Sequence, residues 1–563
     1  MNIMKSSKIF RFIDWCAAHI SNFGLHLIAV LQRRLQFTGY RMTEELLPIS
    51  QTSKTDMSAP GFHPISTAAN SFARLGVFNP SKRQGLSITN QIETPNIIIP
   101  TSRGCIPHLT PDNVQRHVKV PAVYVGLEDF VDRVPMTAPL AQCGRRIREF
   151  ISILPEKTDS GSKDIPIFLA PRRSNPIPSS QANSDNTLAI VTNDGFRQLS
   201  IPDYWRLGHQ IRDENTVIIA PIDLPLLMSP ISSPGAGLLT RDIKRIGGNR
   251  ARKLSSRNEL WSVATLQRFA KDSAVIVPLI PGISMDQQSG YLKSISGLND
   301  HIETIDGTAT RLETGNVSGL AVMDLSSPFL SEPSAAKDDV DLLAEKVMYK
   351  PASDASLTSS LTADFSVLPN ELHDTLRLSL TYLHGPHDVL TVIKNGHDLI
   401  LGDWITTTTD AGVAFTFSLP ANGRAIDATH EKQDIGINLW NTDKYATDLE
   451  PIVERCECYT CTRHHRAYIA HLLNAKEMLA WTLLQIHNIH VANKFMREIR
   501  MSLQAGEFED AASVFEKKYA VRIEGLVHGG GPRVRGYQVR LAGATTKRLN
   551  ESPFQHFKAD DDM

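Results

Sequence analysis

Three cysteines lie within six consecutive positions of this sequence, in the segment Cys456-Glu-Cys458-Tyr-Thr-Cys461. Thiolates at this spacing can bind one metal ion together. Zinc accepts three thiolates and one imidazole in a tetrahedral shell, and such a closed shell leaves no position for a reacting water. The chain has only 6 cysteines in 563 residues, too few for a secreted disulfide scaffold of this length. The segment therefore predicts a structural metal site in an intracellular protein.

The fourth ligand of this site is expected on the segment that follows. Residues 466–500 have the periodicity of a helix, with apolar residues returning every three or four positions. Several histidines lie on or just before this helix, and each could complete the shell. They are His464, His465, His471, His487 and His490. The residue types alone do not choose among them.

The spacing of these residues resembles the zinc signature of the tRNA-guanine transglycosylases. That signature is C-x-C-x2-C followed by a distant histidine, and His487, which lies 26 positions after Cys461, completes it here. The whole stretch 456–488, CECYTCTRHHRAYIAHLLNAKEMLAWTLLQIHN, is similar to the family, and weaker similarity extends over residues 70–540. The resemblance implies a β/α barrel with a zinc subdomain near its C-terminus, in which Cys456, Cys458, Cys461 and His487 hold one structural zinc ion.

The carboxylate that such an enzyme needs for catalysis is missing from this chain. By the resemblance, catalytic members use an aspartate in a G-V-D-[LMI]-F-D-C motif to attack the ribose carbon of a guanosine in tRNA and displace guanine. The equivalent segment here is Gly396-His-Asp-Leu-Ile-Leu-Gly402, which puts Leu401 in the place of the nucleophile. A leucine side chain has no lone pair to offer. The family's D-S-G-G-F-Q segment, which supplies the general base, also has no counterpart at 123–129.

These two absences favour a noncatalytic member of the family. Eukaryotic transglycosylases are heterodimers whose second chain keeps the barrel and the zinc, and the segment 102–110 (SRGCIPHLT) resembles that chain. The resemblance implies a subunit of a complex that exchanges guanine for queuine at wobble position 34 of tRNAs with GUN anticodons. The expected partners are the catalytic chain and tRNA, and no DNA partner is expected.

Basic residues near the cysteine motif are the candidates for tRNA contact, because they could neutralise phosphates. They are Arg463, Arg466, Lys494 and Arg497. Acidic residues between them, such as Glu477 and Glu498, equally suit an ordinary solvated helix face. Two other interpretations stay open. The chain could be an active transglycosylase that uses Asp403 or Asp223 as its nucleophile, or a zinc-stabilised RNA-binding protein without a transglycosylase partner.

The composition places these motifs in a folded chain. Hydrophobic residues make up 41% and charged residues 21%, close to the globular average, and a net charge of -1 excludes a histone-like polycation. Short apolar runs alternate with helical stretches, as expected for parallel strands that are covered on both faces. Seven such runs favour a (β/α)8 barrel over a doubly wound sheet. The runs are 97–99, 120–125, 188–191, 217–222, 274–280, 317–322 and 399–401.

The chain is predicted to have four regions, with polar loop insertions in the barrel. The barrel body is interrupted near 156–186, 229–257 and 331–362, where Ser, Pro, Gly or charged residues are frequent. The predicted regions are an N-terminal extension at 1–58, the barrel body at 59–430, the zinc-binding subdomain with closing helices at 431–545, and a disordered tail at 546–563.

The first forty residues form a basic amphipathic segment. It contains five lysine or arginine residues and only one acidic residue, Asp14. Its longest apolar stretch, 23–31, is too short to cross a membrane. The segment suits a transit peptide, a helix that lies on a membrane surface, or a stretch upstream of a later start at Met42 or Met57. Together with the resemblance, it predicts a cytoplasmic protein with peripheral contact to the outer mitochondrial membrane.

Overall fold

The computed structural model of the chain describes a central set of residues, to which all statements below refer. These residues are 61–68, 71–81, 91–131, 140, 144–158, 161–174, 182–192, 195–223, 248–280, 285–297, 302–303, 309–310, 317–323, 365, 368–420 and 432–521. The predicted N-terminal extension, the predicted tail and the insertion near 331–362 lie outside them, as does most of the insertion near 229–257. No helix among the described residues is long and apolar enough to span a membrane.

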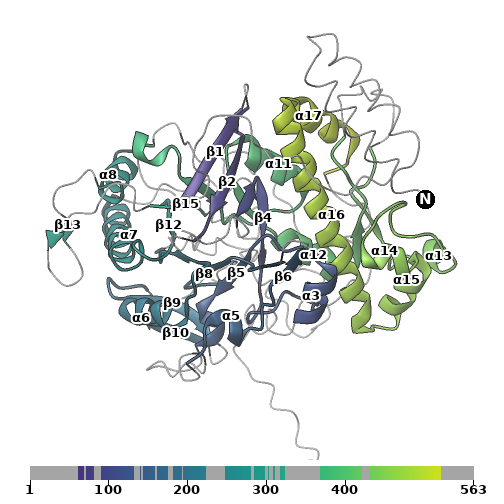
Figure 1. The fold of residues 1–563 in the computed structure, drawn as a ribbon, viewed down its shortest axis with the longest axis horizontal. Helices are drawn as coiled ribbons and strands as arrows, with labels where there is room; N and C mark the ends of the chain where they lie inside the picture. The colour runs from purple at the N-terminus through teal and green to yellow at the C-terminus, as the bar shows by residue number, and fades with distance from the viewer. Residues whose placement is uncertain are drawn as a thin grey trace, which may run out of the picture. The chain divides into compact units, whose positions relative to one another are not determined.

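Eight parallel strands form a closed barrel in the centre of the molecule (Figure 1). They follow one another around the barrel in chain order, and the last strand pairs with the first, with Ile400 opposite Ile97. This confirms the predicted (β/α)8 barrel. The strands are β4 (Asn96–Pro100), β5 (Val123–Gly126), β8 (Ile167–Ala170), β11 (Thr216–Ile219), β12 (Val275–Pro278), β15 (Gly319–Val322), β16 (Leu376–Ser379) and β17 (Leu399–Leu401).

Alternate side chains of these strands belong to two different apolar cores. Ile98, Phe168 and Ile276 lie in a cluster that fills the barrel, whereas Ile97 and Ile99 lie in the cluster that packs against the surrounding helices. This division follows from the two-residue period of a strand, since successive side chains point to opposite faces. The strands are buried on both faces, which explains their nearly continuous apolar runs.

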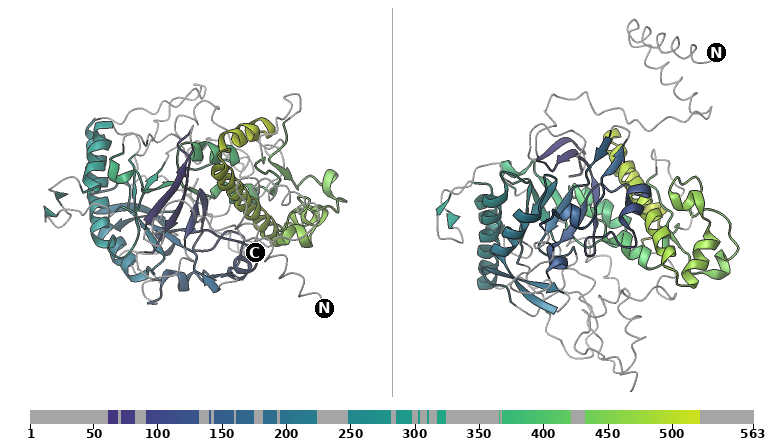
Figure 2. Two further views of the ribbon diagram at one scale, coloured as in Figure 1. Left: turned by 45° about the horizontal axis from the view of Figure 1, so that its top comes forward. Right: turned by 60° about the horizontal axis from the view of Figure 1, so that its bottom comes forward.

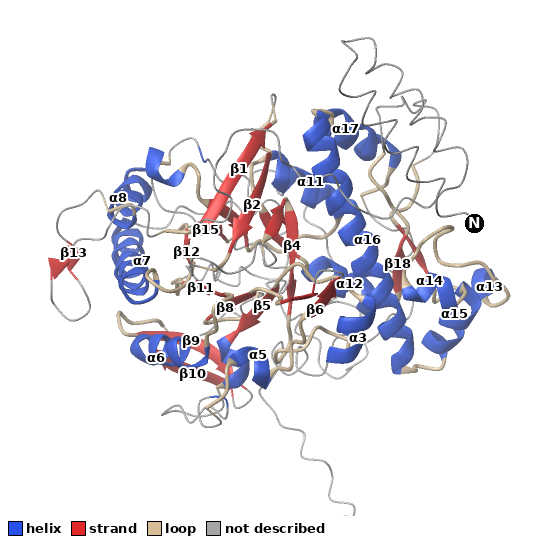
Figure 3. Ribbon diagram, in the orientation of Figure 1, coloured by secondary structure: helices blue, strands red, loops and turns tan. Residues whose placement is uncertain are grey.

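Helices surround the barrel on its outer side, as Figure 3 shows. The longest of them has buried residues at helical spacing, such as Leu254, Trp261 and Phe269, that pack toward the strands. The helices are α3 (Pro111–His117), α5 (Ile147–Phe150), α6 (Ile201–Ile211), α7 (Gly248–Phe269), α8 (Met285–Ile295), α11 (Pro386–Lys394) and α12 (Asp403–Asp410).

A three-stranded antiparallel sheet covers the end of the barrel where the strands begin. It has the order β1 (Gly61–Thr67), β2 (Arg74–Asn79), β3 (Ile92–Thr94), and β3 leads directly into the first barrel strand. The ring of Phe78 lies 6.2 Å from that of Phe168 inside the barrel. This end is therefore closed, and the opposite end, where the strands finish, is the barrel mouth.

The C-terminal part of the described chain is mainly helical and packs beside the barrel (Figure 2). Its central element is the 28-residue helix α16, which ends at Gly506 with a φ of 72°, a left-handed conformation that glycine adopts readily. The other elements are β18 (Val413–Phe415), β19 (Gly436–Asn438), α13 (Thr442–Tyr445), α14 (Tyr459–Arg463), α15 (Arg466–Asn474), α16 (Met478–Ala505) and α17 (Phe508–Lys518).

One predicted barrel strand was wrong, and two were missed. The run 188–191 is part of an antiparallel ribbon outside the barrel, formed by β9 (Thr187–Thr192) and β10 (Gly195–Ser200). The third barrel strand, β8, instead lies within the stretch 156–186 that was predicted to be an insertion. It is only four residues long, so its apolar signal is weak beside its polar neighbours.

The other missed strand, β16, carries a buried charge. Its sequence Leu-Arg-Leu-Ser contains Arg377, whose side chain is buried near Asp398, and this charge interrupts the apolar run that marks the other strands. Three small antiparallel pairs complete the described chain: β6 (Glu156–Thr158) with β7 (Gly161–Lys163), β13 (Ile302–Glu303) with β14 (Ala309–Thr310), and β18 with β19.

Candidate metal centre and barrel mouth

The first turn of α14 and the loop before it position the three cysteines. Cys458 is the N-cap residue of this helix, and its sulfur accepts a hydrogen bond from the backbone N–H of Cys461 at 3.3 Å. Cys456 lies two residues before the cap, after Arg455, which has a φ of 61°. The C-x-C-x2-C spacing thus wraps three sulfur atoms around the start of one short helix.

His487 approaches this group from the first half of α16 and is completely buried. Its Nε2 lies 2.8 Å from the carbonyl oxygen of Phe415. Because a carbonyl oxygen can only accept, Nε2 carries the proton of the neutral imidazole, and Nδ1 then has the lone pair that a metal ion would bind. Nδ1 faces the sulfurs of Cys456, Cys458 and Cys461 at 3.9, 3.5 and 3.4 Å.

The four side chains have the geometry that a tetrahedral zinc ion requires. All four candidate ligand atoms lie within 4.8 Å of one another. In a tetrahedral site with the usual zinc–sulfur and zinc–nitrogen bond lengths, a sulfur and a nitrogen ligand are about 3.6 Å apart. The distances from His487 Nδ1 to the sulfurs lie on both sides of this value. The donor set and its spacing therefore fit a zinc ion.

The close contacts also change the acidity of these groups. Hydrogen bonds from Cys458 and Cys461 lower the pKa of Cys456, whereas hydrogen bonds with the other two thiols, together with burial, raise the pKa of Cys458. Burial alone would lower the pKa of His487, but its hydrogen bonds to Cys456 and Cys461 outweigh burial and raise the pKa to about 9. These shifts favour a negative sulfur beside a positively charged His487, and a divalent metal ion would supply that positive charge in place of the Nδ1 proton.

The structure selects one histidine from the five candidates. His487 lies in the cluster, whereas His464 stacks on Tyr468 and His465 accepts a hydrogen bond from the backbone of Tyr468 at the start of α15. His471 is exposed. Among the described residues, no histidine other than His487 belongs to a group that could hold a metal ion.

The four basic residues proposed to contact tRNA lie in different surroundings. Arg463 and Lys494 are exposed, and Arg497 is half-buried. The guanidinium of Arg466 donates to the carboxylate of Asp448 at 2.9 Å and to the carbonyl of Ile452 at 3.1 Å, so it fixes the start of α15. Arg466 is therefore held inside the subdomain, which leaves the other three better placed to meet a phosphate.

The position assigned to the nucleophile in catalytic members is apolar here. Leu401 ends β17 at the barrel mouth, pairs with Ile98 of β4, and is buried within the apolar cluster that fills the barrel. Ala170, at the end of the third barrel strand, and Tyr124, within the second, belong to the same cluster. The apolar cluster at this end of the barrel therefore contains no carboxylate.

Asp403, the alternative nucleophile, begins α12 and lies two residues beyond the strand. Its Oδ1 accepts a hydrogen bond from the hydroxyl of Ser174 at 3.0 Å, and its side chain is half-buried. Burial, with a contribution from the Asp403 charge, raises the pKa of the nearby Tyr382 to about 12. Asp403 thus lies at the mouth of the barrel, but it is held by Ser174 at the first turn of a helix.

Asp223, the other candidate carboxylate, is already bound by partners within the chain. It is buried just after β11, and its two oxygens accept hydrogen bonds from the amide of Asn183 and the guanidinium of Arg257. Arg257 also pairs with Asp185 at 3.1 Å. Both oxygens of this carboxylate therefore serve to attach α7 and the loop before β9 to the barrel mouth.

Two acids after β5 form a second network of this kind. Glu128 is buried and accepts hydrogen bonds from the backbone N–H groups of Arg173 and Val191 at 2.8 and 3.0 Å. Burial raises the pKa of Glu128. Asp129 binds the guanidinium of Arg173 and, at 2.8 Å, the backbone N–H of Arg103. Sequence reasoning missed both networks, although acids that directly follow barrel strands were a signal for them.

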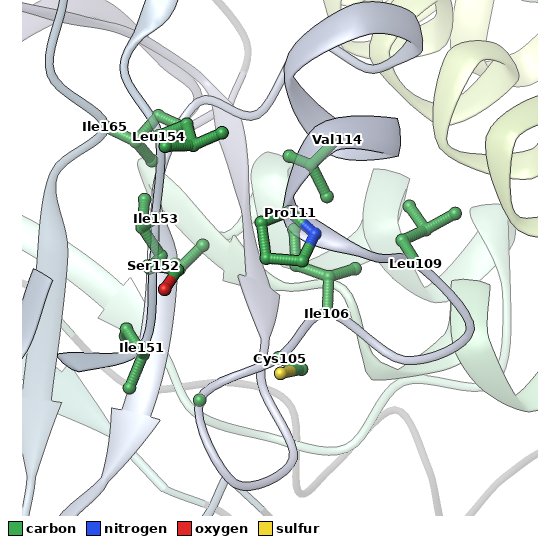
Figure 4. A pocket seen from close by; sticks show the side chains of 12 residues that line it. Cys105, Ile106, Leu109, Pro111, Val114, Ile151, Ser152, Ile153, Leu154 and Ile165 are labelled. Atoms are coloured by element: carbon green, nitrogen blue, oxygen red, sulfur yellow. The ribbon is translucent and has the colours of Figure 1, made fainter. Parts of the chain in front are cut away.

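One further pocket lies apart from the Cys456–Cys461 motif, between the loop after β4 and the segment after α5. Figure 4 shows its lining, in which aliphatic side chains predominate and Cys105 contributes the one sulfur. The residues include Ile106, Leu109, Val114, Ile151, Leu154 and Ile165. No charged side chain lines this pocket, so it does not qualify as a catalytic site.

The sequence of the chain is similar to those of several known proteins. A family model described as "Queuine tRNA-ribosyltransferase" matches residues 368–521, which include the last two barrel strands, the cysteine motif and α16. The chain is 32% identical over 457 residues to the queuine tRNA-ribosyltransferase accessory subunit 2 of Schizosaccharomyces pombe, covering 81% of this chain and 85% of that protein.

Other relatives match over shorter stretches. The accessory subunit 2 of Xenopus laevis is 30% identical over 191 residues, which cover 29% of this chain and 44% of that protein. The queuine tRNA-ribosyltransferase of Moorella thermoacetica is 43% identical over 75 residues, or 13% of this chain and 20% of that protein. Similarity over most of the chain is thus found with the Schizosaccharomyces pombe protein that is named as an accessory subunit.

Proposed function

Because the chain belongs to the queuine tRNA-ribosyltransferase family, we propose that it is the noncatalytic subunit of a heterodimeric transglycosylase. The complex exchanges guanine for queuine at wobble position 34 of tRNAs with GUN anticodons, those for aspartate, asparagine, histidine and tyrosine. This chain contributes contacts to the catalytic subunit and to tRNA. The observation that carries the proposal is the buried leucine, Leu401, at the strand end where a nucleophile is required.

The barrel mouth supports a noncatalytic role in two ways. Catalytic groups of β/α barrels lie at the carboxyl ends of the strands, and covalent base exchange needs a free carboxylate there. Leu401 fills that place with an apolar side chain. Of the acids at the mouth, Asp223 and Glu128 already bind donors of the chain itself with both oxygens, and Asp403 accepts a hydrogen bond from Ser174.

We infer that Cys456, Cys458, Cys461 and His487 hold one structural zinc ion. Four protein ligands would complete the coordination shell, so the ion would supply a cross-link and no site for chemistry. The residues that it joins come from the loop before α14, from α14 itself and from α16, and His487 in turn binds Phe415 of β18. The cluster thus holds three elements of the C-terminal subdomain together.

The tRNA contacts that we propose for this subdomain use its exposed cations. Arg463 and Lys494 are exposed, and Arg497 lies one turn beyond Lys494 on α16. For the location of the protein we propose the cytoplasm, with peripheral contact to the outer mitochondrial membrane. The basic amphipathic sequence of residues 5–34 supports that contact.

Exchange of labelled guanine into tRNA tests the proposed function. We expect no exchange by the isolated chain, and exchange when it is mixed with a catalytic subunit of the family. Base exchange by the purified chain alone would overturn the proposal in favour of an active transglycosylase with Asp403 as nucleophile. Failure of the chain to bind a catalytic subunit, with RNA binding retained, would favour the zinc-stabilised RNA-binding protein.

A further inference from the structure

The amino-terminal half of α7 lies at the rim of the barrel mouth. Arg257 and Asn258 of this helix both bind Asp223, which follows the end of β11. Helix α7 begins nine residues before Arg257, so its first turns project outward from this attachment point. Any group on those turns lies beside the end of the barrel where the strands finish.

These first turns carry an excess of positive charge. The helix starts with Gly-Asn-Arg-Ala-Arg-Lys, and it has no acidic residue in its first turn. Arg250, Arg252 and Lys253 are exposed. The first acid of the helix is Glu259, which lies about two turns beyond these cations. Its charge acts on Tyr291 of the neighbouring helix α8. Because helix starts favour negative side chains, this charge pattern is unfavourable for the helix taken alone.

The cations form a line that continues from the barrel mouth. Arg250, Lys253 and Arg257 are spaced by three and four residues, so they share one face of the helix. Arg257 at the inner end of the line is neutralised by Asp185 and Asp223. Lys253, further out on this line, and Arg252, exposed beside it off the line, form no ion pair with an acid in the part of the chain that the structure describes. The exposed positive surface of α7 therefore begins beyond the ion pairs that Arg257 makes with Asp185 and Asp223.

The surface has no apolar component that would suit a membrane. The apolar residues of these turns, Ala251 and Leu254, are buried in the protein. The exposed neighbours of the cations are small or polar, and no large exposed hydrophobic side chain lies on the described part of α7. A partner that matches such a surface is a polyanion recognised through charge, and a nucleic-acid backbone presents that charge in a regular row.

We propose that Arg252 and Lys253, on the first turns of α7, contact backbone phosphates of the tRNA bound by the complex. This inference rests on the proposed function, and it adds a second contact surface on the barrel rim to the cations of the C-terminal subdomain. Such contacts bind RNA without reading its sequence, and they position the substrate relative to the catalytic partner.

The test compares two double variants of the chain in complex with a catalytic subunit. In R252Q/K253Q the rim loses two charges. In the control K271Q/K293Q two exposed lysines are replaced, one just beyond the opposite end of α7 and one near the end of α8. Lys271 lies about 27 Å along the helix direction from Lys253, at a rise of about 1.5 Å per residue. Binding of fluorescently labelled tRNA is measured by anisotropy from 50 to 200 mM salt.

Removal of one phosphate-binding cation should lower the slope of log affinity against log salt by about 0.7 to 0.9. For R252Q/K253Q we expect a slope lower by about 1.5, so that the affinity advantage of the wild type shrinks about eightfold between 50 and 200 mM salt. The control should keep the wild-type slope. Equal slopes for both variants and the wild type would overturn the rim contact, even where the complex remains active.

Two further outcomes separate the inference from its premise. A wild-type chain that adds nothing to tRNA binding or to base exchange by the catalytic subunit overturns the proposed function as well. Binding to vesicles of phosphatidylcholine and phosphatidylserine is measured with the same variants. Loss of vesicle binding by R252Q/K253Q, with an unchanged tRNA slope, assigns the surface to a membrane and overturns the RNA contact.

Discussion

The imidazole of His487 is held between two groups of opposite character. Its Nε2 donates to the carbonyl oxygen of Phe415 at 2.8 Å, and its Nδ1 faces three sulfur atoms at 3.4 to 3.9 Å. The carbonyl fixes both the tautomer and the plane of the ring, as outer partners of metal-binding histidines commonly do. The ligand atom is therefore positioned by the backbone of β18 before any metal binds.

Substitution of a cluster cysteine should remove the metal and loosen the C-terminal subdomain. We expect Cys458→Ser to abolish stoichiometric zinc and to lower the unfolding temperature, since much of the folding free energy of a small metal site comes from metal binding. Zinc content by mass spectrometry and thermal unfolding check this. Cys105→Ser, at an exposed cysteine outside the cluster, is the matched control and should retain zinc. Full zinc occupancy in the double variant C458S/H487A would falsify the assignment.

Asp403 should be dispensable for base exchange by the complex. The Asp403→Asn variant keeps an oxygen that can accept the hydrogen bond from Ser174, so the fold at the mouth should persist. We expect exchange rates of the reconstituted pair within about twofold of wild type, because a residue outside the chemistry contributes little to the barrier. A loss of activity with subunit association and tRNA binding intact would identify Asp403 as catalytic, and the noncatalytic role would have to be withdrawn.

The buried ion pair between Arg74 and Asp398 should contribute strongly to stability. Asp398 is completely buried and also accepts a hydrogen bond from the backbone N–H of Arg377 at 2.7 Å. Asp398→Asn leaves Arg74 with an uncompensated buried charge, and such losses destabilise by about 3 to 5 kcal/mol. Asp203→Asn, in an exposed pair with Arg206, should change stability by about 1 kcal/mol or less. Denaturant unfolding of both variants measures the contrast, and equal effects would contradict this account.

His397 should make the protein less stable as the pH falls below neutrality. Burial, with added repulsion from Arg377 and Arg74, lowers the pKa of His397 to about 4. Between its unfolded pKa of about 6.5 and this value, the unfolded chain binds a proton that the folded chain does not bind. The free energy of unfolding should therefore decrease by up to about 3 kcal/mol as the pH falls from 7 to 4.

A nontitrating variant isolates the contribution of this histidine. In His397→Asn the amide can still donate to the carbonyl of Val392, which Nδ1 contacts at 3.1 Å. Other groups titrate equally in both proteins. The free energy of unfolding of the wild type should therefore fall relative to that of the variant as the pH decreases. A difference that stays constant from pH 7 to 4 would show that His397 ionises normally.

The sequence predicted the elements whose signals are local. The cysteine spacing and six of the apolar runs, such as 97–99 and 217–222, identified the group that could hold a metal ion and most of the barrel. The sequence-based prediction failed for elements whose structure depends on contacts with residues far away in the chain. Arg377 makes β16 look polar because its environment, which includes Asp398, is assembled only in the fold. The run 188–191 is as apolar as a barrel strand, yet its place in a ribbon depends on its pairing with β10.

The networks at the mouth could not be read from the sequence for the same reason. Asp223 and Arg257 are 34 positions apart, and Glu128 meets the backbone of Val191 across 63 positions. Pairing over such separations is set by tertiary packing, and charged residues after a strand suit catalysis as well as structure. The structure shows that these acids bind partners within the chain.

Closure of the barrel has a consequence for how the protein is synthesised. The first strand, β4, finds its second neighbour only in β17, and Arg500 of α16 donates to the carbonyl of Pro95 across 405 positions. On the ribosome, therefore, the early strands emerge with an open edge and with their apolar faces uncovered. Contacts of such long range also make folding slow. A chain interrupted before β17 therefore cannot close the barrel wall, and one interrupted before α16 lacks both His487 and the helix that binds the start of β4 through Arg500.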